Sequence, residues 1–244
     1  DLVDGHVFTI TPTESATLSE GSQMVTVHLD GALLYPTLAI GSVASHVMIE
    51  INQRAANSLD RGFPLHAGAV ASKVGAIVLP GQSGSGKTTL TTALALAGNG
   101  FIADELTVIG HDSLSAFPYG KPVALRPATV DLLQSSIDRL RRPGWTIEQD
   151  ERFVAPRDLG QVCADPVPVA CVVFPTFHAI GTTQLTAIPA PEALTMLMHS
   201  VLSETALRSS TFESLTRLVR DVPVKRLTYR SAFEAAEMLS KMDE

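Results

Sequence analysis

The sequence is poor in cysteine, and this argues against two kinds of site. Among its 244 residues only Cys163 and Cys171 carry thiols, eight positions apart and with no His or Cys partner at metal-ligand spacing. A disulfide-stapled scaffold or a structural zinc site needs more sulfur or imidazole ligands than this. Both cysteines are therefore predicted to be reduced and partly buried.

Positive charge and long apolar runs are also scarce. The 25 acidic residues outnumber the 18 Lys and Arg, which gives a formal net charge of −7. Nucleic acid is not expected as a main partner, because phosphate backbones require a basic face. No apolar run approaches the roughly 18 residues of a membrane span, and the first twenty residues lack a basic start followed by an apolar stretch. We therefore expect neither a membrane span nor a secretory signal, and a cytoplasmic location.

What remains is an ordinary globular composition. Hydrophobic residues make up 45% of the chain and charged residues 18%, and the chain is long enough to bury a core. The length suits one large domain with or without a small annex. Because the sequence has no internal repeat and no low-complexity linker, its parts are expected to pack together.

The strongest motif is GQSGSGKT, which runs from Gly81 to Thr88 and is called the phosphate loop below. It matches the pattern G-x-x-x-x-G-K-[ST] at every fixed position. The apolar run 75–80 before it predicts a buried strand, and 88–97 after it predicts a helix. In such a loop, backbone N–H groups surround phosphate oxygens, Lys87 adds charge for the outer phosphates and Thr88 offers a hydroxyl to Mg²⁺.

The phosphate loop therefore predicts a nucleoside triphosphate site. A glycine-rich turn that binds nothing is the disfavoured alternative, because the full pattern and its context agree. The predicted nucleotide-binding residues are Gly81, Ser83, Gly84, Ser85, Gly86, Lys87, Thr88 and Thr89.

An acidic pair follows the predicted helix. The apolar run 101–103 leads to Asp104 and Glu105, and a second apolar run, 106–109, comes next. Two carboxylates at the end of a strand after a phosphate loop are typical of a magnesium-binding site, where one holds Mg²⁺ beside Thr88 and the other orients or deprotonates a nucleophile. The alternative is a pair of turn carboxylates in a β-hairpin.

A single histidine, His66, lies in the apolar stretch 63–71, which is predicted to be one strand. A hairpin between this stretch and the strand before the phosphate loop would place His66 beside the nucleotide. Taken alone, the residues favour instead a core or strand-end histidine hydrogen-bonded to a backbone carbonyl.

Residues 1–60 are predicted to form an N-terminal β-rich annex without recognisable chemistry. Asp30-Gly31 is a turn dipeptide between two predicted strands, and a helix is predicted over 42–59 with Ser42 at its N-cap. The annex strands are expected at 7–10, 24–29 and 32–35.

Residues 61–244 are predicted to form the main domain. The methionines of its 191–202 segment are expected in the core. Segment 145–165 is predicted to be irregular. Its Arg152 and Arg157 could close over a triphosphate, although solvated loop charges are the favoured alternative. The later helices are expected at 128–140, 191–202, 211–219 and 231–242, and the later strands at 169–174 and 181–188.

Three stretches in order, HAGAV, GAIVLPGQSGSGKTTL and FIADELTVI, resemble the core of the HPr kinase/phosphorylase family. The resemblance covers 63–110 well. Beyond that it is looser and rests on weak pieces such as FPYGKP at 117–122. It implies an α/β phosphate-loop fold shared with phosphoenolpyruvate carboxykinases, with a mixed sheet and flanking helices, here joined to the β-rich annex.

The resemblance also implies roles for single residues, with ATP and Mg²⁺ as cofactors. Lys87 and the loop amides would hold the β-phosphate, and Thr88 would hold Mg²⁺. Asp104 matches the carboxylate that takes the proton from the attacking serine hydroxyl, and Glu105 matches its acidic neighbour; both are candidate metal ligands. His66 matches a histidine near the transferred phosphoryl group.

The chain departs from the bifunctional family members at their second motif, E-I-R-G-L-G. The most similar stretch of this chain is VALRP at 123–127, which lacks the Glu and the glycines. This argues against phosphorylase activity and against HPr as the substrate, so we expect a kinase only. Relatives of this kind assemble, and a homo-oligomer stays open.

The expected function is ATP- and Mg²⁺-dependent transfer of the γ-phosphoryl group to a serine-type hydroxyl of a protein or peptide, for instance a ribosomally made peptide precursor. Two alternatives stay open at this point. One is a kinase for the hydroxyl of a sugar or amino acid, and the other is a nucleotide-hydrolysing switch. The residues identify neither the acceptor nor a preference for ATP over GTP.

Overall fold

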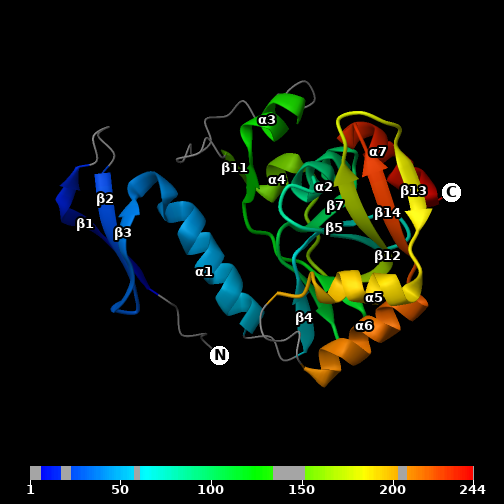
Figure 1. Ribbon diagram of the computed structural model, residues 1–244, viewed down its shortest axis with the longest axis horizontal. Coiled ribbons are helices and arrows are strands. Elements are labelled where there is room, and N and C mark those ends of the chain that lie inside the picture. Colours follow the sequence, from blue (N-terminus) through cyan, green and yellow to red (C-terminus); the bar gives the residue numbers. More distant parts are fainter. Residues whose placement is uncertain (1–6, 18–22, 58–60, 134–151, 203–207, 244) are drawn as a thin grey trace.

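The computed structural model describes residues 7–17, 23–57, 61–133, 152–202 and 208–243. They form a nine-stranded mixed sheet flanked by helices, a two-stranded sheet (β10 and β11) and a three-stranded antiparallel sheet near the N-terminus (Figure 1). The structure confirms the predicted α/β class, with a mixed sheet, flanking helices and a β-rich annex. The strands are β1 (Phe8–Thr17), β2 (Gln23–Leu29), β3 (Ala32–Ala39), β4 (Gly62–Leu65), β5 (Ala67–Ala71), β6 (Ala76–Pro80), β7 (Gly100–Ala103), β8 (Thr107–Gly110), β9 (Ser115–Phe117), β10 (Val123–Leu125), β11 (Arg152–Val154), β12 (Val167–Phe177), β13 (Gln184–Ala187) and β14 (Val224–Tyr229). The helices are α1 (Val43–Asn57), α2 (Lys87–Leu96), α3 (Pro127–Leu133), α4 (Pro156–Leu159), α5 (Ala190–Met198), α6 (Ser209–Asp221) and α7 (Ala232–Ser240), with short 3₁₀ turns at Ile40–Ser42 and Lys241–Asp243.

The annex consists of the antiparallel sheet β1-β2-β3 and helix α1. Asp30 and Gly31 have φ of +52° and +81°, and a two-residue hairpin turn between β2 and β3 requires positive φ at both positions. Along β2 every second side chain is buried, and Val25 and Val27 pack with Val43 of α1. The predicted hairpin and helix are therefore confirmed. The alternation of buried and exposed side chains along β2 gives the annex sheet an apolar face, against which α1 packs. Ser42, the expected N-cap of this helix, lies in the 3₁₀ turn Ile40–Ser42.

The phosphate loop lies at one end of the central strands of the main sheet. β6, which leads into the loop, pairs with β12 in parallel and with β5 antiparallel. The apolar stretch 63–71 is not one strand, as predicted, but two: β4 pairs with β8, whereas β5 pairs with β6 and β7. His66 lies at the break, where its N–H donates to the Ser200 carbonyl at 2.7 Å.

The strands on either side of the acidic pair also separate. β7 pairs with β5, and β8 pairs with β4 and β9. Asp104 and Glu105 are therefore not the turn of a hairpin. They lie where the chain passes from one part of the sheet to another, a position that brings them level with His66 and the phosphate loop.

Helices cover both faces of the main sheet. Along β5 and β6 the buried side chains alternate: Val70 and Ile77 face a core with α2 and α7, and Ala69 and Val78 face a core with α5 and α6. In Figure 1, α2 and α7 lie on one face of the central strands, and α5 and α6 lie on the opposite face. This double cover explains why β5 and β6 are continuous apolar runs in the sequence.

Several later predictions are confirmed and one needs correction. The helices over 211–219 and 231–242 and the strands over 169–174 and 181–188 are present as α6, α7, β12 and β13, and Ser231 caps α7 by accepting from the Glu234 N–H. The segment expected to be irregular contains β11 and α4. β11 forms because it pairs antiparallel with β10, a partner that its own sequence does not reveal. The 134–140 part of the predicted 128–140 helix lies outside the described residues.

Side-chain environments settle two smaller predictions. Helix α5 ends at Met198, which is 39% exposed, so its expected place in the core is wrong; Met196 is partly buried. Cys163 and Cys171 are free thiols, partly buried and buried respectively, as predicted. None of the helices in the described ranges is long and apolar enough to cross a membrane.

Candidate functional site

The phosphate loop turns between β6 and α2, and its shape requires glycine. Gly84 and Gly86 have φ of +84° and +93°, in the left-handed region that disfavours side chains. A Cβ on Gly86 would also collide with the Tyr229 hydroxyl. Gly86 precedes α2 and provides no side chain to cap it, so no N-cap side chain competes with an anion for the N–H groups of the first helical turn.

Two later strands hold the loop from one side. At the end of β12 the Phe177 N–H donates to the Ser85 carbonyl at 3.2 Å, and at the end of β14 the Tyr229 hydroxyl donates to the Gly86 carbonyl at 2.9 Å. The two aromatic rings meet edge to face with centroids 5.8 Å apart. Because β12 and β14 are parallel neighbours, both aromatic residues reach the loop together.

Lys87 is the first residue of α2 and one of the few buried cations. It is 5% exposed, and its ammonium donates to the Gln82 carbonyl at 3.0 Å. Burial lowers the pKa of Lys87, and the carboxylates of Asp104 and Glu105 oppose that shift. An ammonium held among loop N–H groups is suited to bind phosphate oxygens.

Asp104 is enclosed directly behind Thr88. The Thr88 hydroxyl lies 3.3 and 3.2 Å from the two Asp104 carboxylate oxygens, and Asp104 is 1% exposed. Burial raises the pKa of Asp104 to about 6; the Lys121 charge lowers it and the Glu105 charge raises it. The pair joins a hydroxyl at the helix start to a carboxylate, both of which are oxygen ligands that Mg²⁺ accepts.

Glu105 turns away from its neighbour into the open. Its φ of +66° is rare for a residue with a side chain. Lys121 anchors it: the buried ammonium lies 2.8 Å from the Glu105 carboxylate, whose side chain is 45% exposed. Lys121 comes from FPYGKP, a stretch that carried no assigned role in the sequence.

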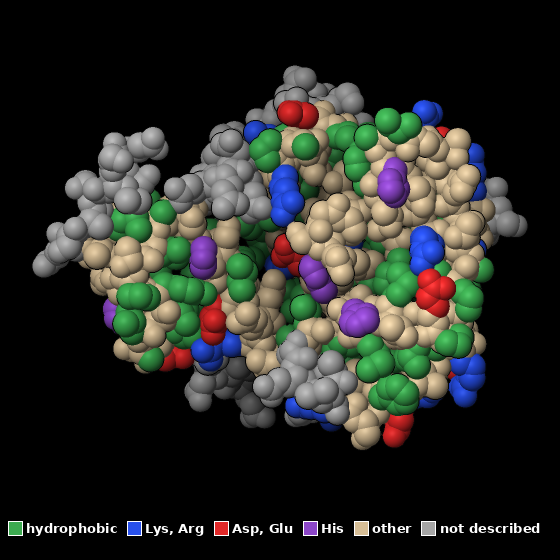
Figure 2. All heavy atoms as spheres, viewed as in Figure 1, with side chains coloured by type: hydrophobic (Ala, Val, Ile, Leu, Met, Phe, Trp, Pro, Cys, Tyr) green, Lys and Arg blue, Asp and Glu red, His purple; other side chains and the backbone are tan. Residues whose placement is uncertain are grey.

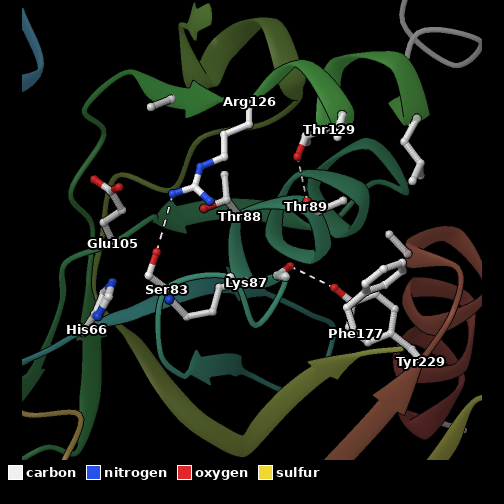
Figure 3. Close-up of a pocket in the computed structure, with 16 residues that line it drawn as sticks. His66, Ser83, Lys87, Thr88, Thr89, Glu105, Arg126, Thr129, Phe177 and Tyr229 are labelled. Atoms are coloured by element: carbon white, nitrogen blue, oxygen red, sulfur yellow. Dashed lines mark hydrogen bonds between the residues drawn. The ribbon is translucent and has the colours of Figure 1, made fainter. Parts of the chain in front are cut away.

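A cavity of about 300 Å³ lies over the loop. His66 and Glu105 lie at one end of it and Phe177 and Tyr229 at the other, with Lys87 and Thr88 between them (Figure 3). The cavity is lined by His66, Ser83, Gly84, Gly86, Lys87, Thr88, Thr89, Glu105, Ala124, Arg126, Ala128, Thr129, Leu132, Phe177, Tyr229 and Ala232.

Most residues predicted for the site thus meet at one cavity. Gly81, Ser85 and Asp104 do not line it. Gly81 packs against the buried Ser85 side chain, where a Cβ would meet the Ser85 hydroxyl at 2.7 Å. His66 lines the cavity, and its pKa is lowered by burial and by the Lys87 charge, which favours a neutral ring.

Arg126 is the main residue that sequence reasoning missed. It projects from the start of α3 over the loop, with its guanidinium 3.5 Å from the Ser83 hydroxyl (Figure 3). Arg152 and Arg157, the arginines considered from sequence, do not line the cavity. The signal for Arg126 was its place in VALRP, the stretch nearest to the family's second motif. Phe177, Tyr229 and Thr129 had no local signal at all.

The residues present fit a metal that is shared with a ligand. Across the described ranges, no three His, Cys, Asp or Glu side chains gather closely enough to hold an ion by themselves. Thr88, Asp104 and Glu105 together offer a hydroxyl and two carboxylates beside the phosphate loop. Mg²⁺ is commonly held in this way, by one or two protein oxygens together with phosphate oxygens and water.

Comparison of the chain with protein-family models and with curated proteins found no match.

Proposed function

We propose that the protein is an ATP- and Mg²⁺-dependent kinase that transfers the γ-phosphoryl group to a serine-type hydroxyl of a protein or peptide. The observation that carries the proposal is the meeting of the phosphate loop, the Thr88–Asp104 pair and the accessible Glu105 around one cavity. The resemblance of residues 63–110 to the HPr kinase/phosphorylase family, and so to the phosphate-loop fold of phosphoenolpyruvate carboxykinases, supports the same interpretation.

The triphosphate would lie along the loop with its outer end at Lys87. Loop and helix N–H groups bind the inner phosphates, while the Lys87 ammonium and the Arg126 guanidinium approach the γ-phosphate from two sides. These two cations neutralise charge that spreads over the equatorial oxygens during transfer. When bound, Mg²⁺ neutralises the β- and γ-phosphate oxygens further.

Two carboxylates are candidates for accepting the hydroxyl proton. The resemblance assigns this role to Asp104, but its carboxylate is enclosed and faces the Thr88 hydroxyl. Glu105 is on the cavity wall, at the same end as His66. We therefore propose Glu105 as the proton acceptor and Asp104 as the group that orients Thr88 and the metal, because a general base must come within hydrogen-bond reach of its proton.

The transfer step then balances without a covalent enzyme intermediate. The acceptor oxygen bonds to the γ-phosphorus as the bond from that phosphorus to the bridging oxygen breaks. The hydroxyl proton passes to Glu105, and the nucleoside diphosphate leaves. Such a step depends mainly on positioning and charge neutralisation, which the residues around this cavity can supply.

The shape of the surface favours a large acceptor. Figure 2 shows a hollow between the annex and the main body, with acidic, basic and histidine side chains at its edge. The Glu105 end of the cavity carries a carboxylate that is nearly half exposed. An open approach of this kind suits a serine on a peptide or loop, whereas a small-molecule kinase needs an enclosed pocket of convergent polar groups.

The proposal is tested by incubating the protein with Mg²⁺ and γ-labelled ATP in the presence of serine-containing peptides, sugars or amino acids. Label on a peptide, absent with Lys87→Ala, is the expected result. Label only on a sugar or amino acid would shift the function to a small-molecule kinase. Phosphate release without any labelled acceptor would identify a hydrolysing switch.

A further inference from the structure

The two ends of the cavity differ in chemistry. One end carries His66, Glu105 and Arg126, which are charged or titratable. The other end carries Phe177 at the end of β12, which is 44% exposed. Leu132, which is 42% exposed and also lines the cavity, lies one turn beyond Thr129 on α3. Large apolar side chains exposed on the wall of a ligand cavity are typical of a surface that a ligand covers.

The direction of the phosphate loop places the nucleoside at this apolar end. In loops of this pattern the lysine reaches the outer phosphates, and the backbone binds the inner ones. The helix continues from Lys87 to Thr89, whose hydroxyl is 2.9 Å from the Thr129 hydroxyl of α3. Thr89 and Thr129 lie away from His66 and Glu105 (Figure 3), so the inner phosphate of a bound nucleotide would point toward α3.

The polar side chains at the apolar end already have partners. Thr129 is hydrogen-bonded to Thr89, and the Tyr229 hydroxyl donates to the Gly86 carbonyl. The other described residues of α3, β12 and α7 that line the cavity are Ala128, Leu132, Phe177 and Ala232, none of which carries a side-chain amide or carboxylate. Reading the edge of a base usually takes such a group, because adenine and guanine differ in the donors and acceptors they present.

We propose that the apolar end is a nucleobase slot, in which Phe177 and Leu132 contact the base without distinguishing adenine from guanine. The inference rests on the proposed nucleotide-binding function and adds the class of base to it. The slot binds purine nucleotides by apolar contact, so ATP and GTP serve equally. Contact of a base with an aromatic side chain depends little on which base is bound, because every base has a π-face.

Calorimetric titration with Mg-ATP, Mg-GTP and Mg-tripolyphosphate tests the slot without any acceptor. Wild-type protein should bind ATP and GTP within about threefold of each other, and both at least about tenfold more tightly than tripolyphosphate. Phe177→Ala and Leu132→Ala should each weaken both nucleotides by about five- to tenfold. Phe177→Ala keeps the backbone N–H that donates to the Ser85 carbonyl of the loop, so tripolyphosphate affinity should change much less than nucleotide affinity. Phe212→Ala, at a phenylalanine 48% exposed on α6, is the matched control and should change nothing.

Each contrary result overturns a different statement. Nucleotide affinity unchanged in both variants would remove the slot but leave the triphosphate site. Loss of tripolyphosphate affinity in Phe177→Ala would mean that this residue supports the loop rather than the base. A more than tenfold preference for one purine would overturn the lack of discrimination. Absence of binding by all three ligands would overturn the proposed function itself.

Discussion

Asp104 and Glu105 are neighbours in the chain but have opposite environments. Asp104 is buried against Thr88, whereas Glu105 adopts φ of +66° and reaches the cavity with its carboxylate held by Lys121. A left-handed residue at this point costs roughly 1–3 kcal/mol in a folded protein, and such strain is often found at functional sites. The backbone change separates one buried carboxylate from one that lines the cavity.

The two carboxylates should respond differently to removal of charge. Glu105→Gln is expected to lower the rate of phosphoryl transfer about 10²- to 10⁴-fold, because a general base is lost, while Mg-ATP affinity changes less than about threefold. Asp104→Asn is expected to raise the Mg²⁺ concentration needed for half-maximal transfer at least about tenfold. Labelled-ATP transfer measured over a Mg²⁺ series separates the two effects.

The matched control for this pair is Glu237→Gln, at an exposed glutamate of α7 that pairs only with Lys241. It should transfer phosphate like the wild type. Normal turnover in Glu105→Gln together with loss in Asp104→Asn at saturating Mg²⁺ would return the base role to Asp104.

Asp104 also links stability to pH. Burial raises its pKa from 3.8 to about 6, so the folded protein binds the proton more tightly than the unfolded chain. The contribution of Asp104 to stability is then fully present below about pH 4 and is lost as the pH rises through 6. At pH 7.5 the loss is up to about 3 kcal/mol, at about 1.4 kcal/mol per pKa unit. Asp104→Asn should therefore be more stable than wild type at pH 7.5, with a smaller difference at pH 4.5.

Urea unfolding with a metal chelator present, at both pH values, measures this difference. The exposed Asp112→Asn serves as the control and should show no pH-dependent gain. Equal destabilisation of Asp104→Asn at the two pH values would contradict the raised pKa.

At the scale of elements, the phosphate loop depends on strands that come much later in the chain. β12 and β14 each end beside it, and their last aromatic residues bond to successive loop carbonyls. The Gly86 backbone and the Tyr229 hydroxyl fit so closely that a Cβ has no room. Loop shape is therefore set by packing against these strands as well as by its glycines.

This fit predicts a coupling between Gly86 and Tyr229. Gly86→Ala should destabilise the fold by about 3 kcal/mol, because backbone strain adds to a collision. Gly98→Ala, at a φ of +100° with open space around the Cβ, should cost only about 1 kcal/mol. Tyr229→Phe should cost about 1 kcal/mol alone but less than that, or nothing, in the Gly86→Ala background.

The free energies of unfolding come from urea titrations of the single variants and the double variant. If the losses of unfolding free energy in Gly86→Ala and Tyr229→Phe simply add in the double variant, the two residues do not constrain one another.

At the scale of the whole molecule, a single sheet covered on both faces brings six separate segments to one cavity. His66, the loop, Glu105, the start of α3 and the ends of β12 and β14 meet there. The two helical layers pack against alternate side chains of the same strands. A ligand that contacts all these segments should stabilise the molecule as a whole.

Mg-ATP is therefore expected to raise the melting temperature. At a hundred times its Kd a ligand adds about 2.7 kcal/mol, which is roughly 5–10 °C for a chain of this length. Lys87→Ala should abolish this shift and phosphoryl transfer, because the charge for the outer phosphates is lost. Lys73→Ala, at an exposed turn lysine, should keep both; a full shift in Lys87→Ala would argue against the triphosphate site.

Much of the fold could be predicted because its signals are local. The Asp30-Gly31 turn, the apolar runs of β6 and β12 and the periodicity of α2 and α6 all come from residues close together in the chain. The sequence does not predict β11, and it predicts one strand around His66 where the structure has two, because strand pairing depends on distant partners. Three residues such as Arg152–Val154 carry too little pattern to show that they pair with β10.

By itself the sequence determined the position of the phosphate loop and of its left-handed glycines, the carboxylates that follow it and the class of the fold. These follow from local rules: only glycine tolerates the left-handed loop positions, and a strand–loop–helix order fits one kind of turn. Only the tertiary structure decided which carboxylate reaches the cavity, which arginine covers the loop and which aromatic residues brace it. Those outcomes depend on where distant strands end, and sequence spacing does not encode the distance between them.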